Sequence, residues 1–359
     1  MYAKSGDIRC HIELSNYCNA ACPMCGRNQV SSSHPHELKI RTDVDSNQLR
    51  VKDIKKIFDD RFFETYTLRT INMCGNRGDP ATAIDLFEIC EYLFSKEKKL
   101  CITIATNGGL KTSAYWKKLG KLFSHYGNKS KVTFGVDGLE DTNHIYRQNV
   151  IFKSVMRNAQ AFIDGGGEAW WQYLVFKHNE HQIGEAKELS EKMGFYKFFI
   201  VHTPRFATSQ KRDGYKVYSY KGKTYVLETA DPDFTSRQEA QRYIDSIEAE
   251  EINCKAIAKK EFYIDNGGRL VPCCWIGNSL DHMLGHGKDK PVRDRIMNMY
   301  DPDEMNVIKN DLVDTLQHDF ITETMPMSWK TIKGDDCSSK TCKSFCSKKR
   351  NIRKNAQHI

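Results

Sequence analysis

The most informative segment of this sequence is Cys18-Asn19-Ala20-Ala21-Cys22-Pro23-Met24-Cys25. It places three cysteines at C-x3-C-x2-C spacing, so a single short loop carries three thiolates. Thiolates are soft ligands that suit zinc, copper(I) and iron–sulfur clusters. Three of them can hold three irons of a [4Fe–4S] cluster and leave the fourth iron without a protein ligand, whereas an electron-transfer cluster normally has four. A zinc knuckle with similar spacing is the alternative.

The residues before this loop predict a strand. From Ile8 to Ser15 the sequence alternates strictly, with apolar side chains at the even positions and polar side chains at the odd positions. Such alternation is typical of a strand with one apolar face. Because this strand runs straight into the cysteine loop, the loop lies at its C-terminal end, where barrel enzymes carry their functional residues.

Strand and helix patterns then alternate along the chain as far as residue 202. The predicted strands span 8–15, 67–75, 100–107, 131–137, 169–176 and 195–202. The predicted helices span 51–63, 83–94, 113–124, 150–163 and 181–193. Alternating β and α elements imply a parallel sheet with right-handed crossovers.

The first strand favours one of two parallel architectures. A strand between two helix layers is apolar almost throughout, but the strand 8–15 is half polar. We therefore predict an α/β fold in which residues 5–203 form a (β/α)6 partial TIM barrel with a polar interior; a doubly wound open sheet is the alternative. The side chains expected in the lumen are Arg9, His11, Glu13, Thr103, Asn107, Thr133 and Asp137.

Characteristic motifs follow the predicted strands. Gly78-Asp79-Pro80 comes after the second strand, where glycine lets the backbone approach a ligand and a carboxylate can accept hydrogen bonds from an ammonium. An ordinary turn before a helix would also contain Asp-Pro. Asn107 ends the third strand and Asp137 the fourth, and Arg147 follows ten residues later with a planar fork suited to carboxylates. A surface arginine is the alternative for Arg147.

The cysteine loop and these strand ends, taken in order, resemble the radical S-adenosylmethionine (SAM) superfamily over about residues 8–202. The resemblance implies that Cys18, Cys22 and Cys25 hold a [4Fe–4S] cluster. The open iron of that cluster would bind the amino and carboxylate groups of SAM and reduce SAM to a 5′-deoxyadenosyl radical. The other cofactor contacts implied by the resemblance fall on Met24, Gly78, Asp79, Pro80, Asn107, Asp137 and Arg147.

Individual roles also follow from the resemblance. The backbone of Met24 would face the adenine, the turn Gly78-Asp79-Pro80 would hold the SAM amino group, and Arg147 would meet the SAM carboxylate. The chain departs from the family pattern in three places. Met24 stands where relatives often have an aromatic residue, Arg77-Gly78-Asp79-Pro80 replaces Gly-Gly-Glu-Pro, and Gly135 replaces the usual serine.

A second group of cysteines occupies the C-terminal part of the chain. Their spacing matches the opening of the superfamily's auxiliary-cluster domain, which is called SPASM when it holds two clusters. In this chain Cys254 is followed by thirteen residues, Gly268, four further residues and Cys273. A hairpin is predicted between these two cysteines, with its turn at 265–268. Too few cysteines follow for two clusters, so the resemblance implies the shortened twitch form with one auxiliary [4Fe–4S] cluster.

The predicted ligands of this auxiliary cluster are Cys254, Cys273, Cys342 and Cys346, with Cys337 next in rank and Cys274 as a spare. A structural zinc held by four thiolates is the alternative. The chain is thus predicted to have three regions: the barrel at 5–203, a linker or insertion at 204–253, and the auxiliary domain at 254–350. The insertion contains a predicted hairpin at 215–228, followed by a polar helix.

Composition favours a cytoplasmic protein. The 359 residues are 40% hydrophobic and 28% charged, with a formal net charge of +8. No apolar run approaches the roughly 18 residues of a membrane helix, and the N-terminus lacks the apolar core of a signal peptide. Thirteen cysteines in a reducing compartment indicate metal ligands rather than disulfides. We expect neither a membrane nor a nucleic acid as a partner.

The resemblance implies an enzyme that cleaves SAM reductively and abstracts hydrogen from a peptide or protein side chain, with a flavodoxin or ferredoxin as electron donor. A small metabolite is the alternative substrate. The first strand begins near residue 8, so we expect no leader-binding domain of the kind found in many peptide-modifying relatives. A non-enzymatic metal-binding module is the alternative class. The candidates for a substrate-facing acid or base are His11, Glu13 and Asp137.

Overall fold

The computed structural model describes residues 2–40, 47–127, 129–203, 206, 214–230, 252–283, 299–329 and 340–346. Cys337 and the polar helix predicted after the 215–228 hairpin lie outside these ranges. No helix within these ranges is long and apolar enough to cross a bilayer.

The centre of the protein is an eight-stranded sheet with the strand order β12-β11-β1-β4-β5-β6-β7-β8. Its six barrel strands are β1 (Gly6–Ile12), β4 (Tyr66–Met73), β5 (Cys101–Thr106), β6 (Lys131–Gly135), β7 (Glu168–Val175) and β8 (Lys197–His202). Each pairs in parallel with the next. These strands follow one another across the sheet in chain order, without the reversal that marks a doubly wound sheet. The prediction of a partial barrel is therefore confirmed.

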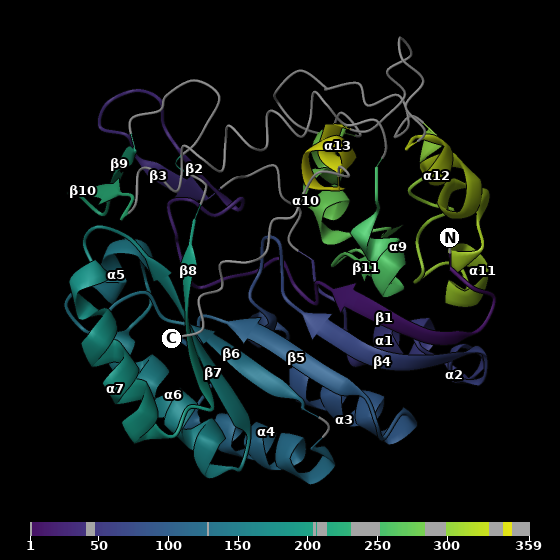
Figure 1. Ribbon diagram of the computed structural model, residues 1–359, viewed down its shortest axis with the longest axis horizontal. Coiled ribbons are helices and arrows are strands. Elements are labelled where there is room, and N and C mark those ends of the chain that lie inside the picture. The colour runs from purple at the N-terminus through teal and green to yellow at the C-terminus, as the bar shows by residue number, and fades with distance from the viewer. Residues whose placement is uncertain are drawn as a thin grey trace.

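Helices cover the outer side of this sheet, as Figure 1 shows. They include α3 (Leu86–Lys96), α4 (Ser113–Tyr126), α6 (Phe152–Asp164) and α7 (Ile183–Met193). The apolar positions of the strands are buried in the core; Ile12, Ile71 and Ile104, for example, are each at most 1% exposed. Burial of such a side chain contributes about 1.5–3 kcal/mol to folding.

The helix predicted at 51–63 is in fact two helices, α1 (Val51–Ile57) and α2 (Asp60–Thr65). Phe58 leaves the helical conformation with a ψ of 66°, and Asp59 then caps α2 by accepting a hydrogen bond from Phe62 N at 2.9 Å. Aspartate is a favoured N-cap residue, so this signal is present in the sequence. The short helix α5 (Asn143–Tyr146) was not predicted, because four residues carry no readable periodicity.

The hairpin predicted at 215–228 is confirmed as β9 (Tyr215–Tyr220) and β10 (Lys223–Glu228). A second antiparallel hairpin, β2 (Asn28–Val30) and β3 (Leu38–Ile40), lies between the cysteine loop and α1. The two hairpins are joined by a backbone hydrogen bond from Ser219 N to His36 O at 2.9 Å.

The C-terminal part adds β11 (Glu261–Ile264) and β12 (Leu270–Val271) to the edge of the barrel sheet. Strand β11 pairs in parallel with β1, so that Tyr263 lies beside His11. The sequence predicts the β11–β12 hairpin but not its pairing with the first strand, because local periodicity does not identify a distant partner. The described helices of this part include α9 (Lys255–Lys259), α10 (Cys274–Met283), α11 (Leu312–Leu316), α12 (Met325–Met327) and α13 (Lys340–Cys346).

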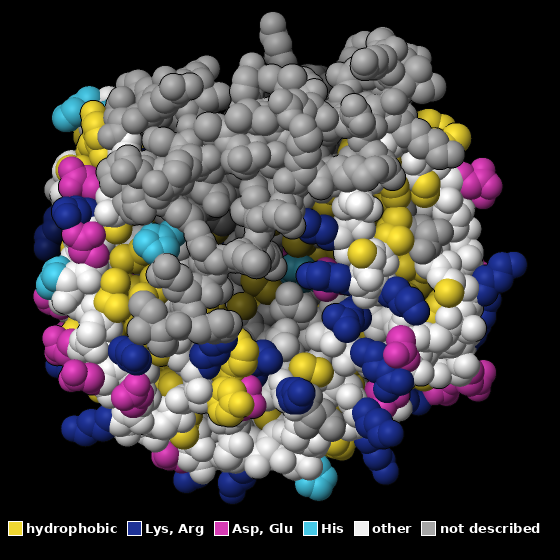
Figure 2. Space-filling view, viewed as in Figure 1, with side chains coloured by type: hydrophobic (Ala, Val, Ile, Leu, Met, Phe, Trp, Pro, Cys, Tyr) yellow, Lys and Arg dark blue, Asp and Glu magenta, His cyan; other side chains and the backbone are white. Residues whose placement is uncertain are grey.

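Side chains of both charges lie on the surface. Figure 2 shows Lys and Arg side chains spread over the described part of one face, with Asp and Glu side chains among them. This distribution agrees with the modest formal charge of +8.

Candidate active site

The cysteine loop follows β1 and is contacted by residues that follow two other strands. Cys22 is buried, while Cys18 and Cys25 are half-buried. Asn107 Nδ2, just after β5, lies 3.6 Å from Cys18 Sγ, and Arg147 Nη1, in the segment after β6, lies 4.0 Å from Cys22 Sγ. The structure therefore brings Asn107 and Arg147 to the three-cysteine loop.

The buried thiols of this loop resist ionisation while they are free. Burial raises the pKa of Cys22 to about 11, although the nearby Arg147 guanidinium acts in the opposite direction, and burial also raises the pKa of Cys18. A soft metal that binds here would displace protons, because the thiolate is the ligand. Within the described ranges, no three His, Cys, Asp or Glu side chains converge closely enough to hold one metal ion. The ligand assignments therefore stay predictions.

The turn Gly78-Asp79-Pro80 lies against the residues that precede the cysteine loop. Asp79 N donates a hydrogen bond to Tyr17 O at 2.8 Å. A Cβ atom on residue 78 would overlap the backbone of Ser15, so this close approach requires glycine. Pro80 then begins a single 3-10 turn over Pro80–Thr82. The motif is thus a turn before a helix and, at the same time, a neighbour of the cysteine loop.

The Asp79 carboxylate is largely occupied by the protein itself. It accepts hydrogen bonds from Ala81 N at 2.9 Å, Thr106 Oγ1 at 2.7 Å and Asn107 N at 2.7 Å. Because a carboxylate offers about four acceptor positions, about one is left for a further donor. Burial raises the pKa of Asp79 and the three hydrogen bonds oppose that rise. The main structural role of Asp79 is to fasten the turn to the end of β5.

Arg147 forms an ion pair with the buried Asp137 at the end of β6. Its Nε donates to Asp137 Oδ2 at 2.6 Å, and Leu174 N donates to Asp137 Oδ1 at 2.7 Å. The Arg147 side chain is 18% exposed and that of Asp137 0%, so the alternative of a surface arginine is wrong. A Cβ atom on Gly135 would stand 2.6 Å from Arg147 Nη2. The glycine that departs from the family pattern therefore makes room for the guanidinium.

The hairpin β9–β10 holds the segment that carries this arginine. The Tyr218 hydroxyl donates to Ile145 O and accepts a hydrogen bond from Gln148 Nε2 at 2.8 Å. Gln148 O in turn accepts from Ala21 N, inside the cysteine loop, at 3.0 Å. The inserted hairpin thus supports both the segment after α5 and, through it, the cysteine loop.

The three candidate acid–base residues are buried and bound to other parts of the chain. His11 Nε2 lies 2.6 Å from Cys74 O, and burial lowers the pKa of His11. Glu13 receives hydrogen bonds from two backbone N–H groups and from the Tyr263 hydroxyl. Burial raises the pKa of Glu13 despite these bonds. Together with the ion pair of Asp137, these contacts indicate that all three residues support the site structurally.

The remaining predicted residues are placed less tightly. Met24 is half-buried and packs against the core. Thr103 Oγ1 donates to Asn72 Oδ1 at 2.9 Å, between neighbouring strands. Arg9, expected in the lumen, is exposed in the middle of β1, so this expectation is wrong. The alternation along a strand predicts which face of the sheet a side chain lies on. It does not predict whether the barrel covers that part of the strand.

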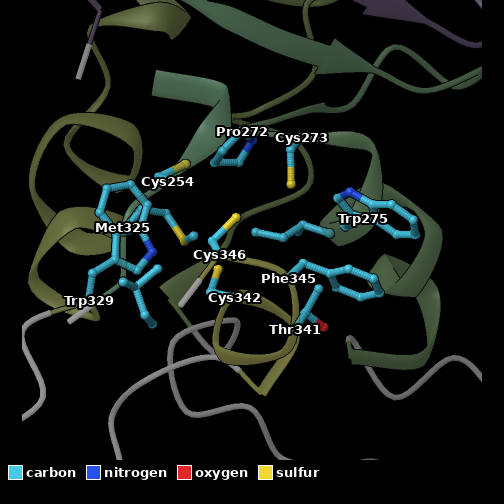
Figure 3. Close-up of a pocket in the computed structure, with 12 residues that line it drawn as sticks. Cys254, Pro272, Cys273, Trp275, Met325, Trp329, Thr341, Cys342, Phe345 and Cys346 are labelled. Carbon is cyan, nitrogen blue, oxygen red and sulfur yellow. The ribbon is translucent and has the colours of Figure 1, made fainter. Parts of the chain in front are cut away.

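Four of the predicted auxiliary ligands line a pocket in the C-terminal part. Cys254 precedes α9, Cys273 precedes α10, and Cys342 and Cys346 lie one turn apart on α13. Figure 3 shows their side chains pointing into a common space. Burial raises the pKa of Cys254 and Cys273. The fold therefore brings together cysteines that are widely separated in the sequence.

Aromatic and apolar side chains surround these four cysteines. Trp275 stacks on Phe345 with a centroid distance of 4.0 Å, and Met325 and Trp329 also line the pocket. Cys274, the spare ligand, is not among the lining residues. Its carbonyl instead accepts a hydrogen bond from Asn76 Nδ2 at 3.0 Å.

Comparison with known families identifies the class of protein. Residues 12–190 match the family model described as Radical SAM superfamily. The chain belongs to this superfamily of enzymes. No curated protein matches the chain.

Solved structures share the fold at low identity. Streptococcus suis SuiB bound to S-adenosylmethionine has a TM-score of 0.52 and 16% identity, over 88% of this chain and 66% of that chain. The enzyme anSMEcpe with bound AdoMet and Cp18Cys peptide also has a TM-score of 0.52 and 16% identity, over 95% of this chain and 89% of that chain. The chain thus spans about two thirds of the length of SuiB. At this identity the likeness is one of fold.

Proposed function

We propose that this enzyme cleaves SAM reductively at a [4Fe–4S] cluster held by Cys18, Cys22 and Cys25, and that it abstracts hydrogen from a peptide or protein side chain. The observation that carries the proposal is the approach of Asn107 and Arg147 to the cysteine sulfurs, at 3.6 and 4.0 Å. Polar groups from two strand ends and three soft ligands on one loop together suit a metal-bound polar ligand.

The residues of the chain would bind and orient SAM around that cluster. Arg147 is held by Asp137 through Nε, and its Nη1 lies at the Cys22 side of the site, where its fork can meet a carboxylate. The backbone of the turn Gly78-Asp79-Pro80 would receive the SAM ammonium, together with the remaining acceptor position of Asp79. The cluster, when bound and reduced by a flavodoxin or ferredoxin, would supply the electron that breaks the C5′–S bond of SAM.

We further propose one auxiliary [4Fe–4S] cluster in the C-terminal pocket, held by Cys254, Cys273, Cys342 and Cys346. Four thiols that point into one space support this proposal, and thiolates suit such clusters. An auxiliary cluster could bind the substrate or accept the electron left after hydrogen abstraction. A structural zinc is the competing occupant, and iron and zinc analysis of anaerobically purified protein distinguishes the two.

The substrate class is supported by the similar structures. SuiB has been solved with the precursor peptide SuiA and anSMEcpe with a peptide, and both share the fold of this chain. A small metabolite is the second candidate. The non-enzymatic alternative is set aside, because the chain belongs to a superfamily of enzymes.

Deuterium transfer tests the proposal. Reconstituted protein would be incubated anaerobically with SAM, dithionite and either the peptide or the metabolite fraction of cells grown on deuterated medium. We expect 5′-deoxyadenosine that carries deuterium from the peptide fraction. Deuterium only from the metabolite fraction would favour the second candidate, and intact SAM with a fully loaded, reducible cluster would contradict the radical mechanism.

A further inference from the structure

Tyr263 reaches from the C-terminal part into the barrel. It lies on β11, which pairs in parallel with β1, and its neighbour in the register is His11. The two rings meet edge to face, with a centroid distance of 5.1 Å. Tyr263 is completely buried, and its hydroxyl donates a hydrogen bond to Glu13 Oε2 at 2.8 Å. A residue outside the barrel sequence therefore completes the hydrogen bonding of a barrel carboxylate.

Glu13 transmits this contact to the turn beside the cysteine loop. Its Oε1 accepts hydrogen bonds from Arg77 N at 2.8 Å and Gly78 N at 2.9 Å. These two N–H groups open the Arg77-Gly78-Asp79-Pro80 motif. A buried carboxylate that accepts two consecutive backbone N–H groups fixes the orientation of that peptide segment, because turning the segment would leave buried donors and the carboxylate without their hydrogen bonds.

Asn76, just before the turn, also bonds to the C-terminal part. Its Nδ2 donates to the Tyr263 hydroxyl at 3.0 Å and to Cys274 O at 3.0 Å. Cys274 begins α10, immediately after the pocket residue Cys273. Helix α10 also packs on the Tyr263 ring, since a Cβ atom on Gly277 would overlap it.

We propose that Glu13 and Tyr263 are positioning residues for SAM, through which the C-terminal part sets the backbone of the Arg77-Gly78-Asp79-Pro80 turn. This inference rests on the proposed function, because it assigns the turn to SAM. Neither side chain needs to touch SAM. Their role is to hold the turn through its N–H groups, so that its carbonyl oxygens are oriented to accept hydrogen bonds from the SAM ammonium, and a small displacement of such groups costs affinity.

The test compares Tyr263→Phe with Tyr66→Phe in the full-length reconstituted protein. Tyr66 is a matched control because it is also buried, donates one hydrogen bond to Ala3 O at 3.0 Å and accepts one from Gln317 Nε2 at 3.2 Å. It lies at the opposite end of β4 from the turn. We measure the Kd for SAM by calorimetry, the shift of the cluster's electron paramagnetic resonance signal when SAM is added, and the melting temperature.

We expect Tyr263→Phe to raise the Kd for SAM by about 5- to 10-fold, the equivalent of one hydrogen bond, and to alter the SAM-dependent spectral shift. Tyr66→Phe should lower the melting temperature to a similar extent and leave both SAM readouts unchanged. Glu13→Ala should have a larger effect than Tyr263→Phe, and Glu13→Gln should recover part of it, since an amide oxygen can still accept from the turn.

The outcomes separate the two proposals. If Tyr263→Phe and Tyr66→Phe change only stability and bind SAM as the wild type does, the positioning role is wrong and the proposed function stands. If the wild-type protein with a loaded cluster binds no SAM, the proposed function fails, and the positioning role fails with it.

Discussion

The two cysteine sites of this protein are built in opposite ways. The N-terminal site takes three cysteines from a single eight-residue loop, Cys18 to Cys25. The C-terminal site takes four cysteines from three segments, between Cys254 and Cys346. The first is defined by local spacing and the second by tertiary packing. The ligands of a local site are joined by a few residues of chain, whereas an assembled site depends on the contacts that hold its segments together.

Their supports differ accordingly. The N-terminal loop is held by hydrogen bonds such as Ala21 N to Gln148 O at 3.0 Å, and the neighbouring Gly78-Asp79-Pro80 turn is bonded to Tyr17 O. The C-terminal site is lined mainly by apolar side chains, including the Trp275–Phe345 stack. We therefore expect loss of the N-terminal cluster to abolish SAM cleavage, and loss of the C-terminal cluster to lower the stability of the fold.

The largest expected effect is that of Cys22→Ala. This variant should reduce 5′-deoxyadenosine formation to the background without enzyme, because the proposed N-terminal cluster would lose one of its three proposed protein ligands. Its melting temperature should change little, since hydrogen bonds still hold the loop. Mass spectrometry of the reaction provides the rate, and Cys101→Ala, in a half-buried strand position away from both sites, is the control. Residual turnover by Cys22→Ala would contradict the assignment of the loop.

The next effect is that of Cys273→Ala on stability. The proposed auxiliary cluster should stabilise the folded protein because it binds only that state, by roughly 4 kcal/mol if the concentration of the cluster exceeds its Kd a thousandfold. The variant should melt close to the temperature of the metal-free protein while it still cleaves SAM. Differential scanning calorimetry of anaerobic samples measures this change. Equal loss of stability in Cys22→Ala would remove the contrast between the two sites.

A smaller effect is expected for Gly135→Ser, which restores the residue usual in the family. The new Cβ atom would lie 2.6 Å from Arg147 Nη2, so the guanidinium must move. We expect the KM for SAM to rise by about 3- to 10-fold, a change of about 1 kcal/mol, with kcat less affected. Gly184→Ser, where a Cβ atom meets nothing within 4 Å, is the control. An unchanged KM would argue against a role for Arg147 in SAM binding.

The smallest effect is expected for Trp275→Ala. Its stacking on Phe345 is worth about 0.5–1.5 kcal/mol, and Trp275 is 44% exposed. The variant should lose auxiliary iron to a chelator about 2- to 10-fold faster. The loss is measured as the decrease in the absorbance of the iron–sulfur cluster. Trp170→Ala, which removes a more distant stack on the barrel with Tyr196 at a centroid distance of 6.3 Å, should leave the rate of iron loss unchanged.

The sequence predicts the barrel well because each strand ends in a recognisable motif. Asn107, Asp137 and Arg147 could be placed near the cysteine loop once the strands were taken as parallel, since their C-terminal ends share one edge of the sheet. The hairpin at 215–228 was likewise visible as a local pattern.

Long-range contacts could not be predicted in this way. The pairing of β11 with β1, and with it the bond from Tyr263 to Glu13, joins residues 250 positions apart. No periodicity identifies such a partner. Similarly, the motif around Asp79 predicts a turn but not that three donors of the chain itself occupy the carboxylate. Local sequence patterns therefore indicate whether a segment is a strand, helix or turn, but not which distant residues it contacts.

The most direct test of the two-site account is an iron count combined with SAM cleavage in three reconstituted proteins. These are the wild type, a Cys18→Ala, Cys22→Ala, Cys25→Ala triple variant, and a Cys254→Ala, Cys273→Ala double variant. We predict about eight irons in the wild type and about four in each variant, with 5′-deoxyadenosine lost only in the triple variant. Four irons in the wild type, all lost in the triple variant, would contradict the auxiliary cluster, and loss of SAM cleavage only in the double variant would contradict the assignment of the catalytic site.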